Sequence, residues 1–590
     1  MLFKEFCLNL EKIALTRSRL EITAQISELF SKADQAQSMQ IAYLLQGEIA
    51  PAHKTIRFNF AEKQMASTLK QLFEVKGFAG FEFDKLKTEK GDLGLVVEYI
   101  FEQVAPQKEA ELSISSVFEF LESFAEVSGD GSVDEKKLKL SLFLEKTSAI
   151  EAKYLIKIIL GSFRMGFSTQ TILDGLAKLF GADASNSKIL KKNIEAEFNV
   201  CADAGLIAKR LKNEGVLFLN EPTPVLGIPI IPAAAERVDV LEDLFKKQTD
   251  FILEPKLDGL RIQIHKSGNK VMFFSRNLND VTHMFPEMIN EFLNLKQENF
   301  ILDGEVVGFD ESELKNLAFQ KTTQRRRKHE VSETSSEIPI KIHLFDIMLL
   351  ENESLLSKPF YERRDLLEKF GNQSKKIDVI AQTKVDLVNH AEAIVEIKNQ
   401  FEHLFELGYE GLMAKKIDGA YQAGKRNFNW IKIKQITESR LGDSIDAVII
   451  GMYLGKGKRA HFGVGSFLLA VKEPRSDSYQ TLARAGSGLQ DEEFKRLAQE
   501  LKPFQTSQKP ANYKVHNSLT PDIWILPEKV VEIIADEITV SKVHSSATDL
   551  LGDGKGLALR FPRILKIRQD KSFEEITTTD ELLTLAKIHV

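Results

Sequence analysis

Over about the first 220 residues, apolar positions recur at three- and four-residue steps with polar residues between them, the pattern of amphipathic helices. Three such runs are Phe6, Leu10 and Ile13; Ile22, Ile26 and Leu29; and Leu155, Ile158, Ile159 and Phe163. Clusters of Gly, Asp and Ser, such as Ser128-Gly129-Asp130-Gly131, separate the helices. Pro222 and Pro224 cannot continue a helix. We therefore predict an all-α domain over residues 1–222.

Beyond these prolines, short apolar or alternating runs predict strands. The predicted strands cover 251–256, 260–265, 271–275, 300–307, 340–346, 412–416 and 430–434. Helical spacing recurs over 284–295, 360–369 and 391–407. This mixture predicts an α/β domain, rich in antiparallel strands, over residues 223–440.

From residue 441 onward, strands predominate. They are predicted over 446–453, 464–472, 480–485, 529–538 and 563–568. Gly-rich turns such as Gly455-Lys456-Gly457 separate them. The pattern predicts a small β-barrel or sandwich over residues 441–590.

Composition limits the classes of function. The 590 residues carry 79 Lys and Arg against 85 Asp and Glu, a net charge of −6. A site for a polyanion must therefore be a local concentration of cations. Cys7 and Cys201 alone cannot supply a disulfide framework or a four-cysteine zinc site. The sequence has no signal peptide and no apolar run of about 18 residues, so we expect a protein of the reducing cytoplasm without a membrane partner.

A lysine closes the first predicted strand of the α/β domain, in Lys256-Leu257-Asp258-Gly259-Leu260-Arg261. The Asp-Gly turn folds the chain into a hairpin, so that Lys256 and Arg261 can face the same space. In the second strand one face carries Leu260, Ile262 and Ile264, and the other carries Arg261, Gln263 and His265. A lysine beside another cation loses its proton more readily and becomes a nucleophile. The alternative is a plain hairpin with surface charges.

Carboxylates interrupt two apolar strands further along. Asp303 and Glu305 alternate onto one face, about 6.6–6.8 Å apart along their strand, and Glu410 precedes the strand 412–416. Buried carboxylates are costly unless they are paired with a cation or bind a metal. Mg²⁺ prefers one or two carboxylates plus substrate phosphates. These residues are therefore candidate metal ligands, with salt bridges to lysines as the alternative.

Two segments concentrate positive charge. In Trp430–Lys434, alternation places Lys432 and Lys434 on one face and two isoleucines on the other. Between residues 553 and 571, six cations stand against two anions. Both segments suit phosphate oxygens, although a lysine-protected edge strand and a solvated terminal strand are the alternatives. Together with the lysine and the carboxylates they indicate phosphoryl or nucleotidyl transfer through a lysine-linked intermediate, without a Walker loop.

The order of these segments resembles that of ATP-dependent DNA ligases of the three-domain type shared by archaea, some bacteria and the eukaryotic nuclear replicative enzyme. The resemblance is carried by Glu254, Lys256–Arg261, Ser275-Arg276-Asn277, Asp303–Glu305, Leu344-Phe345-Asp346, Glu410–Lys415, Trp430–Lys434 and Arg560–Lys571. Residues 44–51 and 163–166 resemble parts of the family's helical DNA-binding domain, and 529–540 part of its OB-fold domain. The resemblance thus implies a helical DNA-binding domain (1–222), an adenylation domain (223–440) and a β-barrel OB-fold domain (441–590).

The resemblance also implies a mechanism. Lys256 would attack the α-phosphorus of ATP, expel pyrophosphate and pass AMP to the 5′-phosphate of a nick in duplex DNA, where the 3′-hydroxyl displaces it. The other implied roles are adenine binding for Glu254 and Phe345; ribose and phosphate contacts for Arg261 and Arg276; ribose or Mg²⁺ binding for Glu305 and Glu410; phosphate neutralisation for Lys415, Lys432 and Lys434; and orientation of pyrophosphate for Arg568, Asp570 and Lys571.

For the DNA contact, Arg164 and the backbone amide of Gly166 are candidates, with a helix cap and a solvated arginine as the alternative. The basic run Gln324–Lys328 could touch DNA or form a solvated loop. The resemblance implies a monomer in a prokaryotic cytoplasm, at the nucleoid, that acts in replication, repair or recombination. A sliding-clamp or repair partner cannot be identified from the sequence.

Four other functions compete with this interpretation. An mRNA-capping guanylyltransferase shares the Lys-x-Asp-Gly core but usually lacks so long a helical domain in front of it, and RNA ligases tend to be shorter. A catalytically dead DNA-clamping protein would not need Lys256, Glu305, Glu410 and Lys434 together. Ligases that use a nicotinamide cofactor carry a zinc-binding cysteine cluster, so two cysteines favour ATP.

Overall fold

The computed structural model describes residues 1–75, 83–104, 111–163, 165–181, 183–238, 241–310, 315–316, 339–371, 373–385, 388–407, 409–434, 444–455, 464–535, 537–552 and 554–586. It divides into two compact units, Met1–Gln435 and Ile436–Val590. The three predicted domain ranges stay a prediction.

The first part of the larger unit is helical, as predicted. Its helices are α1 (Phe3–Leu15), α2 (Arg19–Ser31), α3 (Gln35–Leu44), α4 (Glu62–Val75), α5 (Phe83–Lys90), α6 (Leu93–Val104), α7 (Ile114–Glu126), α8 (Ser132–Leu144), α9 (Ala149–Ile159), α10 (Thr169–Phe180), α11 (Ala184–Val200) and α12 (Ala204–Glu214), and a 3-10 turn, η1, covers Leu217–Asn220. Oxygens of Ser18, Asp34 and Asp203 accept from backbone amides in the first turns of α2, α3 and α12 and so satisfy donors that a helix start leaves free. The predicted apolar stripes lie in the helical core.

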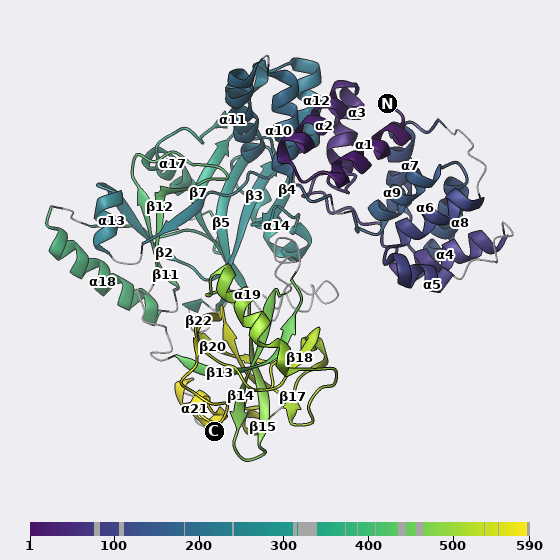
Figure 1. Cartoon of the computed structure of the whole chain (residues 1–590). Coiled ribbons are helices and arrows are strands. Elements are labelled where there is room, and N and C mark those ends of the chain that lie inside the picture. Colours follow the sequence, from purple (N-terminus) through teal and green to yellow (C-terminus); the bar gives the residue numbers. More distant parts are fainter. Residues whose placement is uncertain are drawn as a thin grey trace. The chain divides into compact units, whose positions relative to one another are not determined.

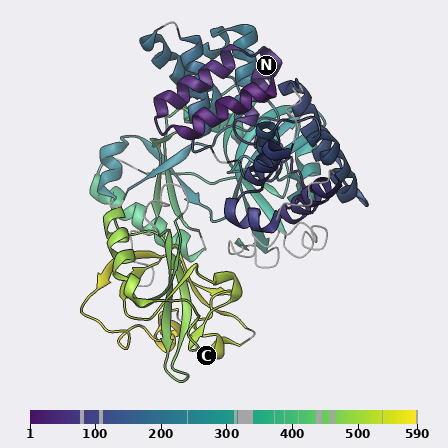
Figure 2. The same cartoon turned by 45° about the vertical axis from the view of Figure 1, so that its right-hand side comes forward.

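These helices form two groups, which can be followed in Figures 1 and 2. In one group α10 contacts α2 and α11, and α3 contacts α12; in the other α6 contacts α5 and α9, and α4 contacts α8. Helix α1 contacts α2 as well as α7 and α9, and so joins the groups. The predicted run through Phe163 ends earlier, at Ile159, because the chain turns at Gly161, whose φ of +62° is left-handed.

Two sheets follow in the same unit, with mostly antiparallel pairing. The five-stranded sheet has the order β1 (Ala234–Arg237), β12 (Arg426–Lys434), β11 (Gly411–Lys416), β2 (Phe251–Lys256) and β10 (Thr383–Lys384). The seven-stranded sheet has the order β4 (Lys270–Ser275), β3 (Leu260–Ser267), β5 (Asn299–Asp310), β7 (Ile340–Leu350) and β8 (Glu353–Ser354), with β6 (Lys315–Asn316) beside β5 and β9 (Ile377–Val379) beside β7.

Helices cover these sheets and close their cores. They are α13 (Glu242–Lys247), α14 (Pro286–Leu293), α17 (Phe360–Leu367) and α18 (His390–Glu406), and 3-10 turns cover Thr282–Met284 (η2) and Glu368–Phe370 (η4). Residues of α13 and α18 pack on the five-stranded sheet, and residues of α14 and α17 on the seven-stranded sheet. A further apolar cluster, which includes Ile230, Ile301, Met348 and Trp430, joins residues of both sheets. Between β2 and β3 the chain passes from one sheet into the other, so these two strands do not pair as the predicted hairpin.

The smaller unit is rich in strands. Its main sheet has the order β16 (Gln505–Thr506), β18 (Ile523–Ile525), β13 (Ile445–Tyr453), β14 (Ser466–Glu473), β15 (Ser478–Ala485) and β17 (Tyr513–Lys514), and β19 (Val530–Ile534) joins β13 to β22 (Arg563–Arg568). Strands β20 (Glu537–Ser541) and β21 (Gly556–Arg560) form a separate pair. The helical segments are α19 (Asp491–Glu500), α20 (Thr548–Leu551) and α21 (Thr579–Leu585), with 3-10 turns at Lys502–Phe504 (η6) and Asn517–Leu519 (η7).

The predicted strand over 529–538 is wrong in one respect, because the structure divides it into β19 and β20, which pair in different sheets. Both cysteines are free and buried. Among the described residues, none of the helices combines the length and apolarity that crossing a bilayer requires.

Candidate active site

Strand β3, which follows the Asp258-Gly259 turn, places its residues on the predicted faces. Leu260, Ile262 and Ile264 lie in the core of the seven-stranded sheet. Gln263, on the opposite face, hydrogen-bonds the backbone of Ile230. The turn passes so close to β5 that a Cβ at Gly259 would lie 2.3 Å from the Val306 carbonyl oxygen. Only glycine fits this turn without a shift of the chain.

Lys256 ends β2 and pairs with the carboxylate of Glu410. Its Nζ forms an ion pair and hydrogen bond with Glu410 Oε2. The backbone supports the pair, because Glu410 N donates to the Lys256 carbonyl at 2.8 Å and Gly411 lies opposite Lys256 in the sheet. The two side chains are 22% and 18% exposed. The amine is thus held in place while a reactant can still reach it.

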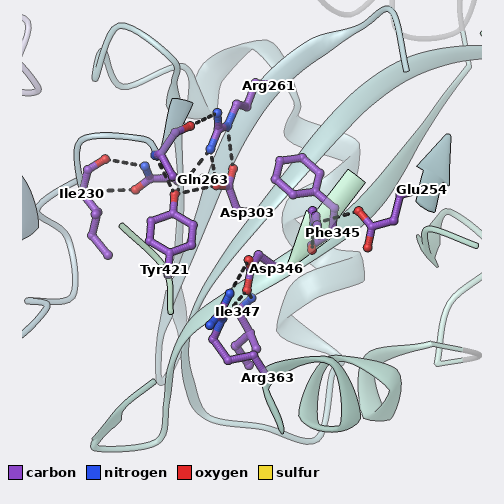
Figure 3. A network of polar contacts seen from close by, with 12 residues as sticks. Ile230, Glu254, Arg261, Gln263, Asp303, Phe345, Asp346, Ile347, Arg363 and Tyr421 are labelled. Carbon is purple, nitrogen blue, oxygen red and sulfur yellow. Dashed lines mark hydrogen bonds and ion pairs between the residues drawn. The ribbon is translucent and has the colours of Figure 1, made fainter. Parts of the chain in front are cut away.

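Arg261 is bound by the carboxylate of Asp303. Its Nε and Nη2 donate to the two oxygens of Asp303 at 3.0 and 2.7 Å, and its Nη1 donates to the Ala233 carbonyl at 2.7 Å. Tyr421 donates to Asp303 Oδ2 at 2.8 Å. Figure 3 shows this network. Asp303 is fully buried. The charge of Arg261, the cation predicted to lie beside Lys256, is therefore balanced inside the protein.

Glu305 lies opposite Arg261 in the pairing of β3 with β5. Burial raises the pKa of its carboxyl to about 7, although the charges of Lys256 and Arg261 oppose this shift. A carboxylate that is costly to ionise in the protein alone is stabilised when a cation binds beside it. Among the described residues, no group of three or more His, Cys, Asp or Glu side chains gathers as a metal site. Glu305 and Glu410 suit an ion that takes its other ligands from water and phosphate.

The raised pKa of Glu305 predicts a pH dependence of stability. The native carboxyl holds its proton up to about pH 7, whereas its ordinary pKa is 4.5. The stability that it contributes is therefore full below pH 4.5 and is lost as the pH rises through 7. Relative to Glu305→Gln, the wild type should lose up to about 3 kcal/mol over this interval.

Urea unfolding without nucleotide or divalent metal, repeated from pH 4.5 to 8, measures this difference. The exposed Glu298 supplies the control variant Glu298→Gln. Parallel stability curves for the wild type and Glu305→Gln would contradict the raised pKa.

At the other end of the site, Glu254 lies beside an aromatic cluster. It is 1% exposed, and its Oε2 pairs with Lys415 Nζ at 2.7 Å. Lys415 also donates to the Phe345 carbonyl at 2.6 Å, and its Nζ lies 4.7 Å from the centre of the Trp430 ring. The charge of Lys415 is thus balanced by Glu254, and its predicted contact with phosphates stays a prediction. Lys415 thus links Glu254 to the backbone of Phe345, and Figure 3 labels both residues.

The residue after Phe345 fixes this part of β7. Asp346 and Arg363 are both fully buried and form a double hydrogen bond, Nε to Oδ1 at 2.7 Å and Nη2 to Oδ2 at 3.0 Å. Arg363 also donates to the Gly419 carbonyl at 3.0 Å. The pair ties β7 to α17 and to the turn after β11, and so holds the strand that carries Phe345.

The remaining predicted residues of the larger unit lie on other strands and turns. Arg276 is exposed in the turn after β4. Lys432 is half-buried in β12, where Ile431 and Ile433 fill the opposite, core-facing positions as predicted. The backbone of Lys434 pairs with Gly411, but its side chain lies outside the described residues. Gly166 has a left-handed φ of +76° with open space around it. Arg164 and the run 324–328 lie outside the described residues.

In the smaller unit the three predicted residues form one ion-pair network. Arg568 donates to both oxygens of Asp570, at 2.8 and 2.7 Å, and to Asp446 at 3.0 Å. Lys571 donates to Asp446 at 2.6 Å. The Arg568 guanidinium holds the pKa of the Asp570 carboxyl well below its usual range. The end of β22 therefore presents a preformed set of charges.

Sequence reasoning missed the residues that hold this site together. Tyr421, Arg363 and Asp446 each contact a predicted residue or its neighbour. Their partners lie from 17 to 125 positions away. No local spacing could have indicated them, although the buried position of Arg363 beside Leu367 follows from the apolar face of α17.

Family models cover most of the chain. An ATP dependent DNA ligase domain matches residues 232–434, a DNA ligase N terminus matches 2–177, and an ATP dependent DNA ligase C terminal region matches 460–571. A probable DNA ligase of Dictyoglomus turgidum is 37% identical over 588 residues, which are 99% of this chain and 97% of that protein.

Two further likenesses extend over almost the whole length. A DNA ligase of Nitrosopumilus maritimus is 34% identical over 587 residues, 98% of this chain and 96% of that protein. The solved structure named Pmar-Lig_PreS3 shares the fold, with a TM-score of 0.55 and 19% identity over 95% of this chain and 99% of that one. Because the likeness in sequence is nearly continuous and passes through Lys256 and its surrounding carboxylates, the chain belongs to the ATP-dependent DNA ligase family.

Proposed function

We propose that this ATP-dependent DNA ligase seals nicks in duplex DNA through an AMP group carried on Lys256 Nζ. The observation that carries the proposal is the position of Lys256, an amine paired with Glu410 at the end of β2 and near Glu305. A partly exposed lysine is suited to covalent catalysis when an adjacent base can take its proton, and the paired carboxylate of Glu410 is such a base.

In the first step the unprotonated Nζ attacks the α-phosphorus of ATP. The N–P bond forms as the α–β phosphoanhydride bond breaks, and pyrophosphate leaves with the electron pair. The 5′-phosphate of the nick then displaces the lysine and takes AMP, and the 3′-hydroxyl displaces AMP to form the phosphodiester. Most of the catalysis comes from positioning and from neutralising charge.

ATP would be bound at both ends of the site, with its base at one end and its ribose and phosphates at the other. Glu254 accepts from the adenine amino group, and Phe345 stacks on the base, because this end combines a buried carboxylate with an aromatic ring. Arg276, Lys432 and Lys434 bind the ribose and phosphates. Arg261 acts on the same groups from a fixed position, since Asp303 holds its guanidinium.

Glu305 and Glu410 fit Mg²⁺ as acidic oxygen ligands beside the reacting amine. The ion would supply charge neutralisation at the phosphates. The raised pKa of Glu305 supports this assignment, because a nearby cation is what would make its ionisation favourable.

The smaller unit is proposed to be an OB-fold that serves the adenylation step. The antiparallel connections of β13 with β14 and β19, and of β14 with β15, support this fold. Arg568 and Lys571 would act on the leaving pyrophosphate, with Asp570 orienting Arg568.

Arg568→Ala should therefore reduce self-adenylation at least about a hundredfold, the usual scale for losing a transition-state contact. It should spare sealing of nicks that already carry 5′-AMP. Quenched-flow assays of the two steps measure both effects. Lys566→Ala, which removes an exposed cation of the same strand, is the control. Equal damage to both steps would contradict a role in pyrophosphate release.

The DNA substrate is proposed to be a nicked duplex bound by a monomer, with the helical part and the segment of Arg164 and Gly166 in contact with DNA phosphates. Replication, repair or recombination in a prokaryotic cytoplasm is the proposed setting. An mRNA-capping guanylyltransferase or RNA ligase is less supported, since relatives named DNA ligase match over nearly the full length.

Sealing of labelled nicked duplexes distinguishes these functions. We expect sealing of a DNA nick with ATP and Mg²⁺, and no covalent adduct with GTP. A guanylyl adduct, or sealing of RNA alone, would overturn the proposal.

A further inference from the structure

Gln382 and Arg364 contact Glu254, and neither lies in the short segments on which the resemblance in the sequence rests. Gln382 Nε2 donates to Glu254 Oε1 at 2.9 Å, and Arg364 Nη1 lies 3.6 Å from the same oxygen. Gln382 directly precedes β10, where Thr383 lies opposite Leu253 in β2. The register therefore keeps Gln382 next to Glu254. One carboxylate oxygen is held by Gln382, while the other is held by Lys415.

Arg364 is anchored but incompletely satisfied. It is 9% exposed; its Nε donates to Glu368 at 2.6 Å, and its Nη2 donates to the Ile380 carbonyl at 2.7 Å. Its Nη1 is buried and has no hydrogen-bond acceptor among the described residues. A buried donor left unpaired has lost its hydrogen bonds to water without gaining any in the protein, so such an atom calls for an explanation.

This unpaired donor lies beside a small apolar cluster that includes an aromatic ring on its partly buried side. Leu257, Val307 and Ile380 pack together with the partly buried Phe345 and Tyr409. Arg364 is attached to the cluster through the Ile380 carbonyl, and Lys415 through the Phe345 carbonyl. An acceptor, Glu254 Oε1, and a donor, Arg364 Nη1, therefore lie 3.6 Å apart at one edge of the cluster.

We propose that Arg364 and Gln382 complete a purine-reading edge with Glu254. In adenine, the amino group on C6 is a donor, and the ring nitrogens N1 and N7 on either side of it are acceptors. Glu254 accepts from the amino group, and Arg364 Nη1 donates to one of these nitrogens. Gln382 is a positioning residue that keeps the carboxylate turned toward the base. Guanine presents O6 where adenine presents the amino group, so its oxygen would meet the carboxylate.

This inference rests on the proposed adenine contact of Glu254, and nucleotide analogues separate the two. Self-adenylation is measured as kcat and KM with ATP, purine riboside triphosphate, 1-deaza-ATP and 7-deaza-ATP. Purine riboside triphosphate lacks the amino group and probes Glu254. Each deaza analogue replaces one ring nitrogen by CH and probes Arg364. If purine riboside triphosphate reacts as well as ATP, the proposed contact of Glu254 with the adenine amino group is wrong, whatever the deaza analogues show.

For the wild type we expect about a tenfold loss of kcat/KM with one of the two deaza analogues, the scale of a hydrogen bond from a charged donor. With ATP, Arg364→Met should have a kcat/KM about tenfold below that of the wild type. With the deaza analogue to which the wild type is sensitive, the variant should lose no further kcat/KM. Arg364→Lys, which keeps the cation, serves as a second variant if the methionine variant does not fold. Lys369→Met, at an exposed neighbouring position, is the control.

Gln382→Met should raise the KM for ATP several-fold with kcat nearly unchanged, and should narrow the preference for ATP over GTP. Equal sensitivity of the wild type and both Arg364 variants to each deaza analogue would overturn the role of Arg364, as would a wild type that is indifferent to both. An unchanged KM and unchanged ATP preference in Gln382→Met would overturn the role of Gln382.

Discussion

Lys256→Ala is expected to abolish formation of the AMP adduct, because no other group replaces an amine as the nucleophile at the end of β2. The loss should exceed about a thousandfold. Binding to nicked duplex should stay mostly intact, since the substitution removes one cation from a chain with 79 Lys and Arg. Incubation with α-labelled ATP followed by denaturing gel electrophoresis measures the adduct, and a mobility-shift titration measures binding.

Lys270→Ala is the matched control for this variant, because Lys270 is an exposed lysine at the start of β4. It should form the adduct at the wild-type rate. The Lys256→Ala protein should still seal some nicks that are supplied with 5′-AMP. Normal labelling of Lys256→Ala would show that another residue carries the nucleotide.

Arg363→Met is expected to produce the largest loss of stability, about 3–5 kcal/mol. The substitution leaves the Asp346 carboxylate fully buried without its ionic partner and removes two backbone contacts, to the carbonyls of Lys358 and Gly419. The free energy of unfolding from urea titration measures the loss. Because Asp346 follows Phe345, the variant should also raise the KM for ATP where it is still folded.

Lys369→Met, which removes an exposed cation just beyond the same helix, should change the free energy of unfolding by less than about 0.5 kcal/mol. The double variant Arg363→Met with Asp346→Leu removes both charges and should recover part of the loss. A loss below about 1 kcal/mol in the single variant would mean that the buried pair contributes little.

Local pattern was sufficient to predict the elements that carry the site. The two-residue period of strands placed Leu260 and Ile262 in the core and Arg261 on the other face. The Asp258-Gly259 turn does connect β2 to β3, but the predicted hairpin is wrong, because the two strands pair in different sheets. The predictions of faces rest on neighbouring residues, so the sequence contains all the information they need.

Short or partner-dependent elements could not be predicted in the same way. Strand β1 has only four residues, and its register is set by parallel pairing with β12, almost 200 positions away. The break between β19 and β20 depends on their pairing with different sheets. Helix α19 was not predicted, although the sequence carries a signal for it. Gln490 and Glu493 form a capping box at its start, and apolar residues follow at helical spacing.

The polar network was the least predictable part of the site. Carboxylate spacing made Asp303 a candidate metal ligand or a partner of a lysine, and the structure pairs it with Arg261 and Tyr421 instead. Similarly, no local pattern indicated that the ammonium of Lys415 contacts Glu254, and the phosphate contact implied by the likeness to ligases stays a prediction. Charge alone does not determine a partner, because the partner is set by tertiary contacts between distant strands.

The central claim is that Lys256 Nζ carries AMP, and peptide mass spectrometry tests it most directly. The wild-type protein is incubated with ATP and Mg²⁺, digested, and its peptides are mapped under conditions that preserve a phosphoramidate. We expect one adenylyl group, located on the peptide that contains Lys256. An adenylyl group on any other residue, or none in a protein that nevertheless seals nicks with ATP, would contradict it.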